Sequence, residues 1–483
     1  MRRLFSLASA FLLAGAPAPA GAQRPDTLRL ALDEAVSRAL RVSDEALIAD
    51  AQVNLADAAV TSARATIFPQ LRITGGYTKS IESARAAAVG QIFNQPNTYS
   101  SNANFSQTLF QGGREFAGMS AARFTQKAAR LSAFEVRAQV AINVQRAYLS
   151  AVYADRIVGI QSRNADLSAA RLVQVRQLQT AGRAARYEVL RASVERANLE
   201  PLLIQSRSDR ELAVLELKRL LNIPVGQPVT LTTSLEPQAV QAIVASATRD
   251  TFVSSSRASV QAAELAARAR KLSVRAARAD LLPTVSVFFN QGYQAFPLAG
   301  LPETRGRVSN EFCPDGTPTS RTCNNGGFFR DRSVGVNFTW ALFDGLRTKG
   351  AIDLAQAQAE IARLQLEQQR EVVSIEAARA RAEFNRARAQ FDARQQTAAE
   401  AGESFQLASL RFTRGLGTQL DVSDAQVALF TAESNEARSV YDLYLAYAEL
   451  ARAEGRPIPL PPAGVLPPRL TQTPAVRGQI SSP

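Results

Sequence analysis

The second half of this sequence repeats the first half, and the repeat limits what the chain can fold into. Three segments recur in the same order: 62–69 as 276–283, 104–114 as 337–347, and 180–182 as 413–415. The last two pairs are both offset by 233 residues. Loops change length easily, so a fixed spacing over so long a span predicts a rigid element between the two segments.

Hydrophobic periodicity and turn residues predict the same element order in each repeat: a helix, two strands, a very long helix and a shorter helix. We expect the first set at 43–67, 71–77, 99–110, 114–179 and 186–221, and the second at 251–282, 284–290, 333–342, 347–412 and 419–454. The chain then divides into a first structural repeat over 23–226, a linker over 227–250 and a second structural repeat over 251–456. The predicted fold class is mainly α with added β-strands, internally duplicated.

The two long helices carry a seven-residue apolar repeat. Phe384, Phe391 and Phe405 lie on this repeat in the second half, and Ala151 and Leu172 lie on it in the first. A seven-residue repeat packs helices as left-handed coiled coils. Each long helix should span roughly 100 Å at 1.5 Å per residue, and the two shorter helices can stack end to end beside it. A soluble coiled-coil rod without a pore would satisfy the helices alone.

The four strands favour a membrane protein over such a rod. Each is about 10 residues long with alternating apolar and polar residues, which is typical of a transmembrane β-barrel. Tyr77, Tyr293 and Trp340 suit the aromatic girdles at the membrane interfaces. Four strands cannot enclose water, and open sheet edges are not tolerated in lipid. We therefore expect several chains to share one barrel. An eight-stranded barrel is filled by its own side chains, so a conduit favours three or more chains.

The N-terminal residues predict an exported protein. Residues 1–22 have the pattern of a signal peptide, and no later stretch predicts a transmembrane helix. The Pro-rich tail over 457–483 is predicted to be disordered.

The repeat offset rises from 214 to 233 between the first and second recurring segments, so the second half has 19 extra residues there. This insertion contains Cys313 and Cys323, which we expect to form a disulfide in a surface loop.

The composition argues against several other classes of function. The 483 residues include no His and two Cys, so a His-dependent triad is excluded and a metal site is not predicted. No glycine-rich phosphate loop with Lys is present, and no nucleophile stands beside a base. The net charge is +13, but the Arg residues are interleaved with acidic and amide residues along helices, as on solvated helix faces. We predict no enzyme activity, no cofactor and no nucleic-acid partner.

The ordered motifs together resemble one known family. The Ala-Arg-Ala…Leu-Pro helix end, the Leu-Phe-x-Gly-Gly strand end and the Gly-x-Gly-Thr-x-x-Asp-Val turn are similar to those of TolC-like outer membrane efflux proteins, over 28–454. The resemblance implies a homotrimer in the lipid of the cell outer membrane, with a 12-stranded β-barrel and a barrel of coiled-coil α-hairpins that crosses the periplasm. It also implies a periplasmic adaptor protein and, through it, an inner-membrane transporter. The function implied is the passive exit duct of a tripartite efflux or type I secretion system.

The resemblance also implies a periplasmic aperture. Asp421 and Asp424 match acidic positions that surround the entrance in the family, and Glu188 is the first-repeat equivalent of Asp421. Because they are three residues apart, Asp421 and Asp424 share one helix face. In a trimer each would form a ring of three carboxylates that favours cations. The alternative is that both stabilise the helix N-terminus, where acidic residues are favoured in any helix.

The two hairpin tips match the turns that dock onto the adaptor in the family. These residues are Gly182, Ala184, Gly415, Leu416, Gly417 and Thr418. The glycines also permit tight turns, whatever their role in docking. A Tyr and an Arg of the family's closing network correspond here to Phe412 and Gly417, so the closed-state bonds must differ. The sequence does not indicate the exported substrate. A second hypothesis is a periplasm-spanning structural or adhesin-like coiled coil with a small membrane anchor.

Overall fold

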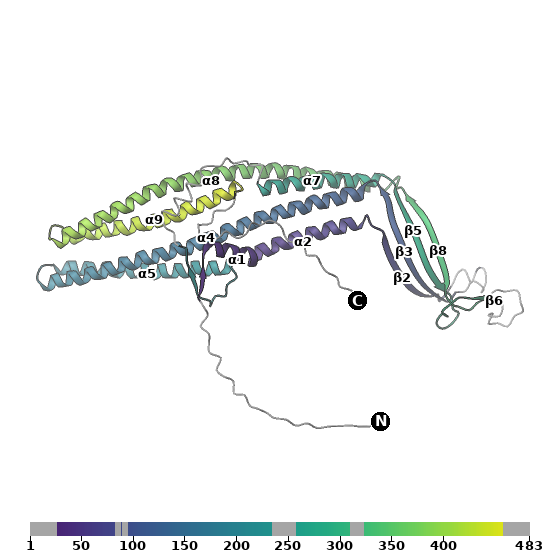
Figure 1. Ribbon diagram of the computed structural model, residues 1–483, viewed down its shortest axis with the longest axis horizontal. Coiled ribbons are helices and arrows are strands. Elements are labelled where there is room, and N and C mark those ends of the chain that lie inside the picture. The colour runs from purple at the N-terminus through teal and green to yellow at the C-terminus, as the bar shows by residue number, and fades with distance from the viewer. Residues whose placement is uncertain (1–26, 83–87, 89–94, 234–256, 310–322, 457–483) are drawn as a thin grey trace, which may run out of the picture.

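Two long antiparallel helical hairpins lie side by side and lead into one β-sheet at their far end (Figure 1). The computed structural model describes residues 27–82, 88, 95–233, 257–309 and 323–456. The predicted signal peptide, the Pro-rich tail and Cys313 lie outside these residues. The disulfide between Cys313 and Cys323 therefore stays a prediction.

Both repeats contain the expected elements in the expected order. The first has α2 (Asp44–Ala65), β2 (Gln70–Lys79), β3 (Asn97–Gln111), α4 (Arg114–Thr180) and α5 (Arg186–Leu220). The second has α7 (Ala258–Arg278), the 3-10 turn η3 (Ala279–Leu281), β5 (Thr284–Ala295), β8 (Phe329–Thr339), α8 (Arg347–Thr413) and α9 (Gln419–Ala453). Helices α4 and α8 have 67 residues each, and α5 and α9 have 35 each. The constant offset therefore reflects helices of equal length.

The shorter helices pack along the long ones as the lengths require. Helices α2 and α5 lie against α4, while α7 and α9 lie against α8 (Figure 1). The two hairpins are joined by contacts of α4 with α7 and with α9. Among the described residues, no helix combines the length and the apolar character needed to cross a membrane.

The sheet has four strands in the order β2-β3-β5-β8, and all neighbours are antiparallel. Val285 pairs with Phe338 and Val287 pairs with Val336, so apolar residues share one face. The last strand begins and ends earlier than predicted, because β8 spans Phe329–Thr339 instead of 333–342. Trp340 and Leu342 were expected inside this strand and lie beyond it. The apolar alternation continues past the last hydrogen-bonded pair, and periodicity alone does not detect that end.

Several short elements were not predicted, although Leu32, Ala35, Val36 and Ala39 do have the spacing of one helix face. These elements are β1 (Leu28–Leu30), α1 (Leu32–Val42), β4 (Val229–Leu231), β6 (Val308–Ser309) and β7 (Cys323–Asn324). Strand β4 falls at the start of the predicted linker and pairs in parallel with β1. The buried Tyr148 of α4 binds this small sheet, because its hydroxyl donates to the Leu30 carbonyl at 2.8 Å and accepts from the Thr233 N–H at 3.1 Å.

The largest buried cluster lies in the middle of the molecule, where α1, α4, α5, α8 and α9 meet. Phe384 and Phe391 of the seven-residue repeat are 5% and 1% exposed there, and Ala151 is fully buried on α4. A buried guanidinium lies nearby at the start of α7. Arg257 is 4% exposed and binds Glu135 of α4 at 2.7 Å and also Glu376 of α8. Three helices are thus joined at one charged contact.

Candidate functional site: the hairpin tips

The two hairpin tips have the same backbone geometry. After α4, Gly182 has a φ of 72°, and the N–H of Arg183 donates to the Leu178 carbonyl at 2.8 Å. After α8, Gly415 has a φ of 75°, and the N–H of Leu416 donates to the Arg411 carbonyl at 2.8 Å. This bond, together with a left-handed glycine, defines a Schellman motif. Glycine is needed at both positions because a side chain is strained at such a φ.

The remaining tip residues are placed mostly at the surface. Leu416 is 70% exposed, and Thr418 is exposed, while Ala184 and Gly417 are half-buried. A methyl group added at Gly417 would lie 3.3 Å from the Cβ of Arg411, so the close approach of the two chain segments favours glycine. Local backbone geometry is thus enough to explain the glycines at both tips, and the docking role of the tips stays a prediction.

Asp421 caps the start of α9. Its carboxylate accepts from the Thr418 N–H at 2.8 Å, and its own N–H donates to the Thr418 hydroxyl at 3.2 Å. This reciprocal pair is a capping box. Hydrogen bonding to Thr418, with the positive charge of Arg411 nearby, lowers the pKa of Asp421 below its ordinary value. Asp421 therefore caps α9, as the capping alternative expects of this residue, and the place of Asp421 and Asp424 in the aperture stays a prediction.

Glu188 occupies the same place in the first repeat. Its carboxylate accepts from the N–H of Ala185 at 3.3 Å at the start of α5. Ala185 has no hydroxyl, so only half of the capping box is present in this repeat. Glu188 lies at the other tip from Asp421 and is not among the residues that line the acidic groove described next.

An acidic groove of about 700 Å³ runs between α8 and α9 near the second tip. The structure brings Asp421 and Asp424 together on its wall, as the spacing predicts. Glu400 and Glu403 of α8 line the same groove, with Arg411 beside them. We did not predict these two residues, although their own three-residue spacing indicates one helix face. The groove therefore carries four carboxylates and one guanidinium on each chain.

Polar contacts join the two hairpins above the tips. We call this row of contacts the hairpin seam, and it consists of Ser423–Glu195, Gln426–Asn164 and Glu433–Arg163. The amide pair is buried, and the Gln426 side chain donates to the Asn164 side chain at 2.7 Å. Ser423 donates to Glu195 at 2.8 Å. The sequence does not reveal these partners, because their pairing depends on the rotation of separate helices.

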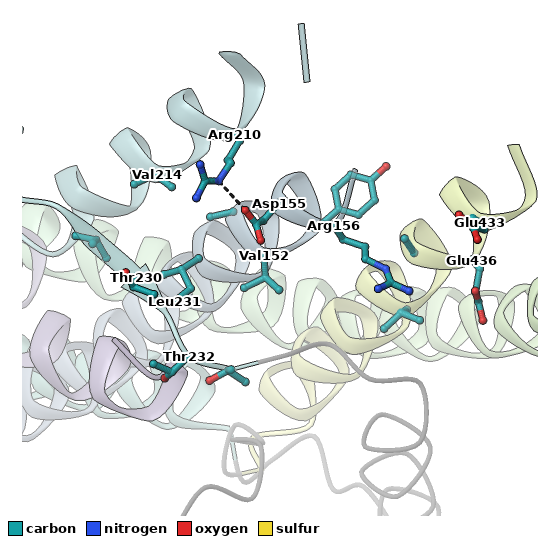
Figure 2. A pocket seen from close by; sticks show the side chains of 16 residues that line it. Val152, Asp155, Arg156, Arg210, Val214, Thr230, Leu231, Thr232, Glu433 and Glu436 are labelled. Carbon is teal, nitrogen blue, oxygen red and sulfur yellow. Dashed lines mark ion pairs between the residues drawn. The ribbon is translucent and has the colours of Figure 1, made fainter. Parts of the chain in front are cut away.

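A second hollow of about 320 Å³ lies near the middle, between α4, α5, β4 and α9 (Figure 2). Asp155 and Arg210 form an ion pair at 2.7 Å on one side. Arg156 lies toward Glu433 and Glu436 on the other side (Figure 2). Burial and the nearby Glu433 raise the pKa of Glu436, while Arg156 opposes the shift. The charges are largely matched within the hollow. No group of His, Cys, Asp and Glu that could hold a metal ion is found in the described part of the chain.

Comparison with known proteins decides the family. The model of the outer membrane efflux protein family matches residues 35–222 and 253–456, which cover most of both repeats. This chain belongs to the outer membrane efflux protein family. The resemblance drawn from the motifs is thereby confirmed. The protein is an efflux protein of the outer membrane.

Solved structures show the same fold at low sequence identity. The outer membrane protein VceC of Vibrio cholerae is 20% identical with a TM-score of 0.68, and the match covers 89% of this chain and 97% of VceC. The outer membrane channel CmeC of Campylobacter jejuni is 15% identical with a TM-score of 0.71, covering 88% and 85%. The MtrE channel of Neisseria gonorrhoeae, solved in an open state, is 17% identical with a TM-score of 0.66, covering 88% and 89%. No curated protein sequence matches the chain.

Proposed function

We propose that three copies of this chain close one 12-stranded barrel and one helical tunnel, which together form a passive exit duct. The open sheet is the observation that carries the proposal. Strands β2 and β8 are its edges, and within the described residues each has a strand partner on one side only. Open edges are not tolerated in lipid. Because the two edges run in opposite directions, β2 of one copy can pair with β8 of the next.

The sides of the helical layer support the same arrangement. Helix α8 lies at one side of a single chain, and α2 and α5 lie at the other. Both sides expose large apolar residues, including Leu354 and Ile361 on α8, Leu55 on α2 and Leu212 on α5. Apolar side chains left in water at both sides of one layer favour the lateral addition of further copies.

At the entrance, the acidic groove of each copy would contribute to a ring. Asp421 and Asp424 are both exposed in one chain, and Glu400 and Glu403 add two carboxylates to the same groove. Three such grooves around an axis would concentrate cations and bind divalent ones, because converging carboxylates attract positive charge. The hairpin seam would hold this entrance narrow, since it ties α9 to α4 and α5.

We further propose that the exposed tips dock onto a periplasmic adaptor protein, which connects the duct to an inner-membrane transporter. Leu416 supports this, because a leucine that is 70% exposed at the end of a long hairpin offers an apolar contact. The transporter would supply the energy and select the substrate. The duct itself would carry out no chemical step.

Ion conductance across planar bilayers tests the proposed duct. The purified full chain should give discrete channels that favour cations. Asp421→Ala combined with Asp424→Ala should lower cation selectivity and weaken block by divalent ions. Asp33→Ala with Glu34→Ala is the matched control, because these acidic residues also begin a helix, α1, and lie far from the tips (Figure 1).

Two results would contradict parts of this proposal separately. A protein that inserts into the bilayer but gives no discrete channels would contradict the duct and support a structural rod. Channels whose selectivity is unchanged in the tip variant would leave the duct intact and remove Asp421 and Asp424 from its entrance.

A further inference from the structure

A belt of exposed apolar side chains surrounds the junction between sheet and helices. Phe68, Trp340 and Phe343 are 52%, 52% and 83% exposed there. Tyr77 and Tyr293 lie near the opposite end of the sheet and are also exposed. Tyr293 pairs with Arg330, ten residues before Trp340, which is about 33 Å along the strand. With the strand tilt usual in barrels, this separation fits the apolar band of about 25 Å that such barrels present to lipid.

A basic stripe lies on the helical side of this belt. Lys271, Arg275 and Arg278 follow each other on α7 at intervals of four and three residues, so they share one helix face. All three are exposed, and none forms an ion pair with any residue that the structure describes. The stripe runs directly into the belt, because Leu281 follows it and its carbonyl accepts a hydrogen bond from the Trp340 indole at 3.2 Å.

Neighbouring elements add further positive charge at the same level. Arg64 lies in the last turn of α2 and over the Phe68 ring at 5.4 Å, while Arg347 and Lys349 lie in the first turn of α8. These three side chains are exposed. An arginine stacked on an interfacial phenylalanine presents its guanidinium at the height where lipid headgroups lie.

The acidic residues at this level are fewer than the basic ones, and Glu115 and Asp353 form no ion pair with any residue that the structure describes. Asp280 forms an ion pair with Arg114, and Asp344 accepts from both the N–H and the hydroxyl of Thr348 at the start of α8. The junction therefore keeps an excess of free positive charge, which the acidic groove near the second tip does not have. Positive charge is thus in excess at the junction of sheet and helices, whereas carboxylates outnumber the guanidinium in the groove near the hairpin tip.

The basic stripe stays accessible in an assembly of several copies. Helix α7 lies between α4 and α8 within one chain, so its flanks are already covered by its own chain. Closing a barrel through β2 and β8 brings copies together at α2, α5 and α8 instead. Lys271, Arg275 and Arg278 therefore remain open to what lies next to the helical layer.

We propose that this basic stripe binds the headgroups of anionic phospholipids in the periplasmic leaflet of the outer membrane. This inference rests on the proposed barrel and on its orientation, with the helices in the periplasm. The belt residues contact acyl chains, and the cations of α7, which lie between one and about three turns further along the helix, meet phosphate groups, the charge that complements them. The stripe would fix the height of the duct in the membrane and enrich anionic lipid around it.

The single tryptophan of the chain makes a direct test possible, because Trp340 lies where the stripe meets the belt. The full chain is reconstituted in phosphatidylcholine vesicles that contain either dibrominated phosphatidylglycerol or dibrominated phosphatidylcholine. Bromine on acyl chains quenches tryptophan on contact, so the two series give the relative affinity of each headgroup at this site. We expect the anionic lipid to bind at least about threefold more tightly in low salt, and high salt should reduce the preference.

Variants separate charge from structure. The preference for anionic lipid should disappear in the triple variant Lys271→Gln, Arg275→Gln and Arg278→Gln, so that both lipids bind with about equal affinity. It should persist in the charge-conserving variant Lys271→Arg, Arg275→Lys and Arg278→Lys. The matched control replaces three exposed arginines of α8 that lie at least about 45 Å from the start of this helix. This variant should also keep the preference for anionic lipid. Its substitutions are Arg379→Gln, Arg388→Gln and Arg394→Gln.

The possible failures are distinguishable. Equal quenching by both lipids, or an unchanged preference in the glutamine variant, would overturn the headgroup site while leaving the barrel in place. Such a result is expected if the stripe faces the bore of the duct. A Trp340 that neither lipid quenches would instead contradict the placement of the belt in the membrane, and with it the proposed barrel.

Discussion

The middle of the molecule and the hairpin tips are built from the same helices but are held together in different ways. In the middle, Tyr148 and Phe391 are almost fully buried, and Arg257 joins three helices through two carboxylates. Toward the tips, the hairpins are joined by the polar hairpin seam, and the turns themselves are exposed. Apolar burial resists separation more strongly than a few polar pairs do. From this comparison we infer that the middle is the fixed part and that the tips separate more easily.

The largest effect should come from the buried middle. Phe391→Ala removes a ring that is 1% exposed between α8 and its neighbours. We expect the free energy of unfolding to fall by about 3–5 kcal/mol, since the lost burial is added to a cavity. Urea unfolding of the detergent-solubilised protein, followed by circular dichroism, measures this change.

Phe412→Ala is the control for that substitution, because Phe412 is a half-buried phenylalanine of the same seven-residue series at the end of α8. It should change the unfolding free energy much less. An equal decrease in the free energy of unfolding in the two variants would contradict the distinction between a fixed middle and a movable tip.

An intermediate effect is expected in the hairpin seam. Gln426→Ala leaves the buried Asn164 amide without its partner, which costs about 1–3 kcal/mol locally. Because this pair joins α9 to α4, its loss should favour separation of the hairpins and raise the single-channel conductance. Gln205→Ala serves as a control, since the Gln205 side chain donates to Asp209 on its own helix, α5, and belongs to neither the acidic groove nor the hairpin seam. A conductance equal to that of the unchanged protein would mean that the seam does not restrain the entrance.

The smallest effect should come from a change in one cap. Thr418→Ala removes the hydroxyl that accepts from the Asp421 N–H, and N-cap losses of this kind cost about 1 kcal/mol. Hydrogen exchange should increase in the first turn of α9 and stay unchanged in the first turn of α5, where Ala185 already lacks a hydroxyl. Protection lost along the whole of α9 would show that the tip is coupled to the middle more tightly than we propose.

Sequence alone predicted the repeats well because rigid helices fix the offset between matching residues. The 67- and 35-residue helices follow from that offset, and the shared face of Asp421 and Asp424 follows from their spacing. The end of β8 was missed, since the apolar alternation continues to Leu342 after the ladder stops at Thr339. The short strands β1 and β4 have too few residues to show a period.

Contacts between helices were the part that no sequence pattern could supply. Gln426 and Asn164 are 262 residues apart, and their pairing depends on how α9 is rotated against α4. The ion pairs of Arg257 with Glu135 and Glu376 likewise depend on how α7, α4 and α8 pack against one another. By contrast, the Schellman turns at Gly182 and Gly415 are local, and their glycines indicated them directly.

Disulfide formation between edge strands tests the central claim most directly. In a background with Cys313→Ser and Cys323→Ser, Thr74→Cys on β2 is combined in turn with Asp331→Cys, Ser333→Cys or Asn337→Cys on β8. All four positions lie on the polar face of the sheet by alternation, so one combination should come into register. After mild oxidation of the membranes, we predict covalent dimers and trimers and no larger species. No intermolecular bond in any combination, or a series that stops at dimers, would contradict a barrel closed by three copies.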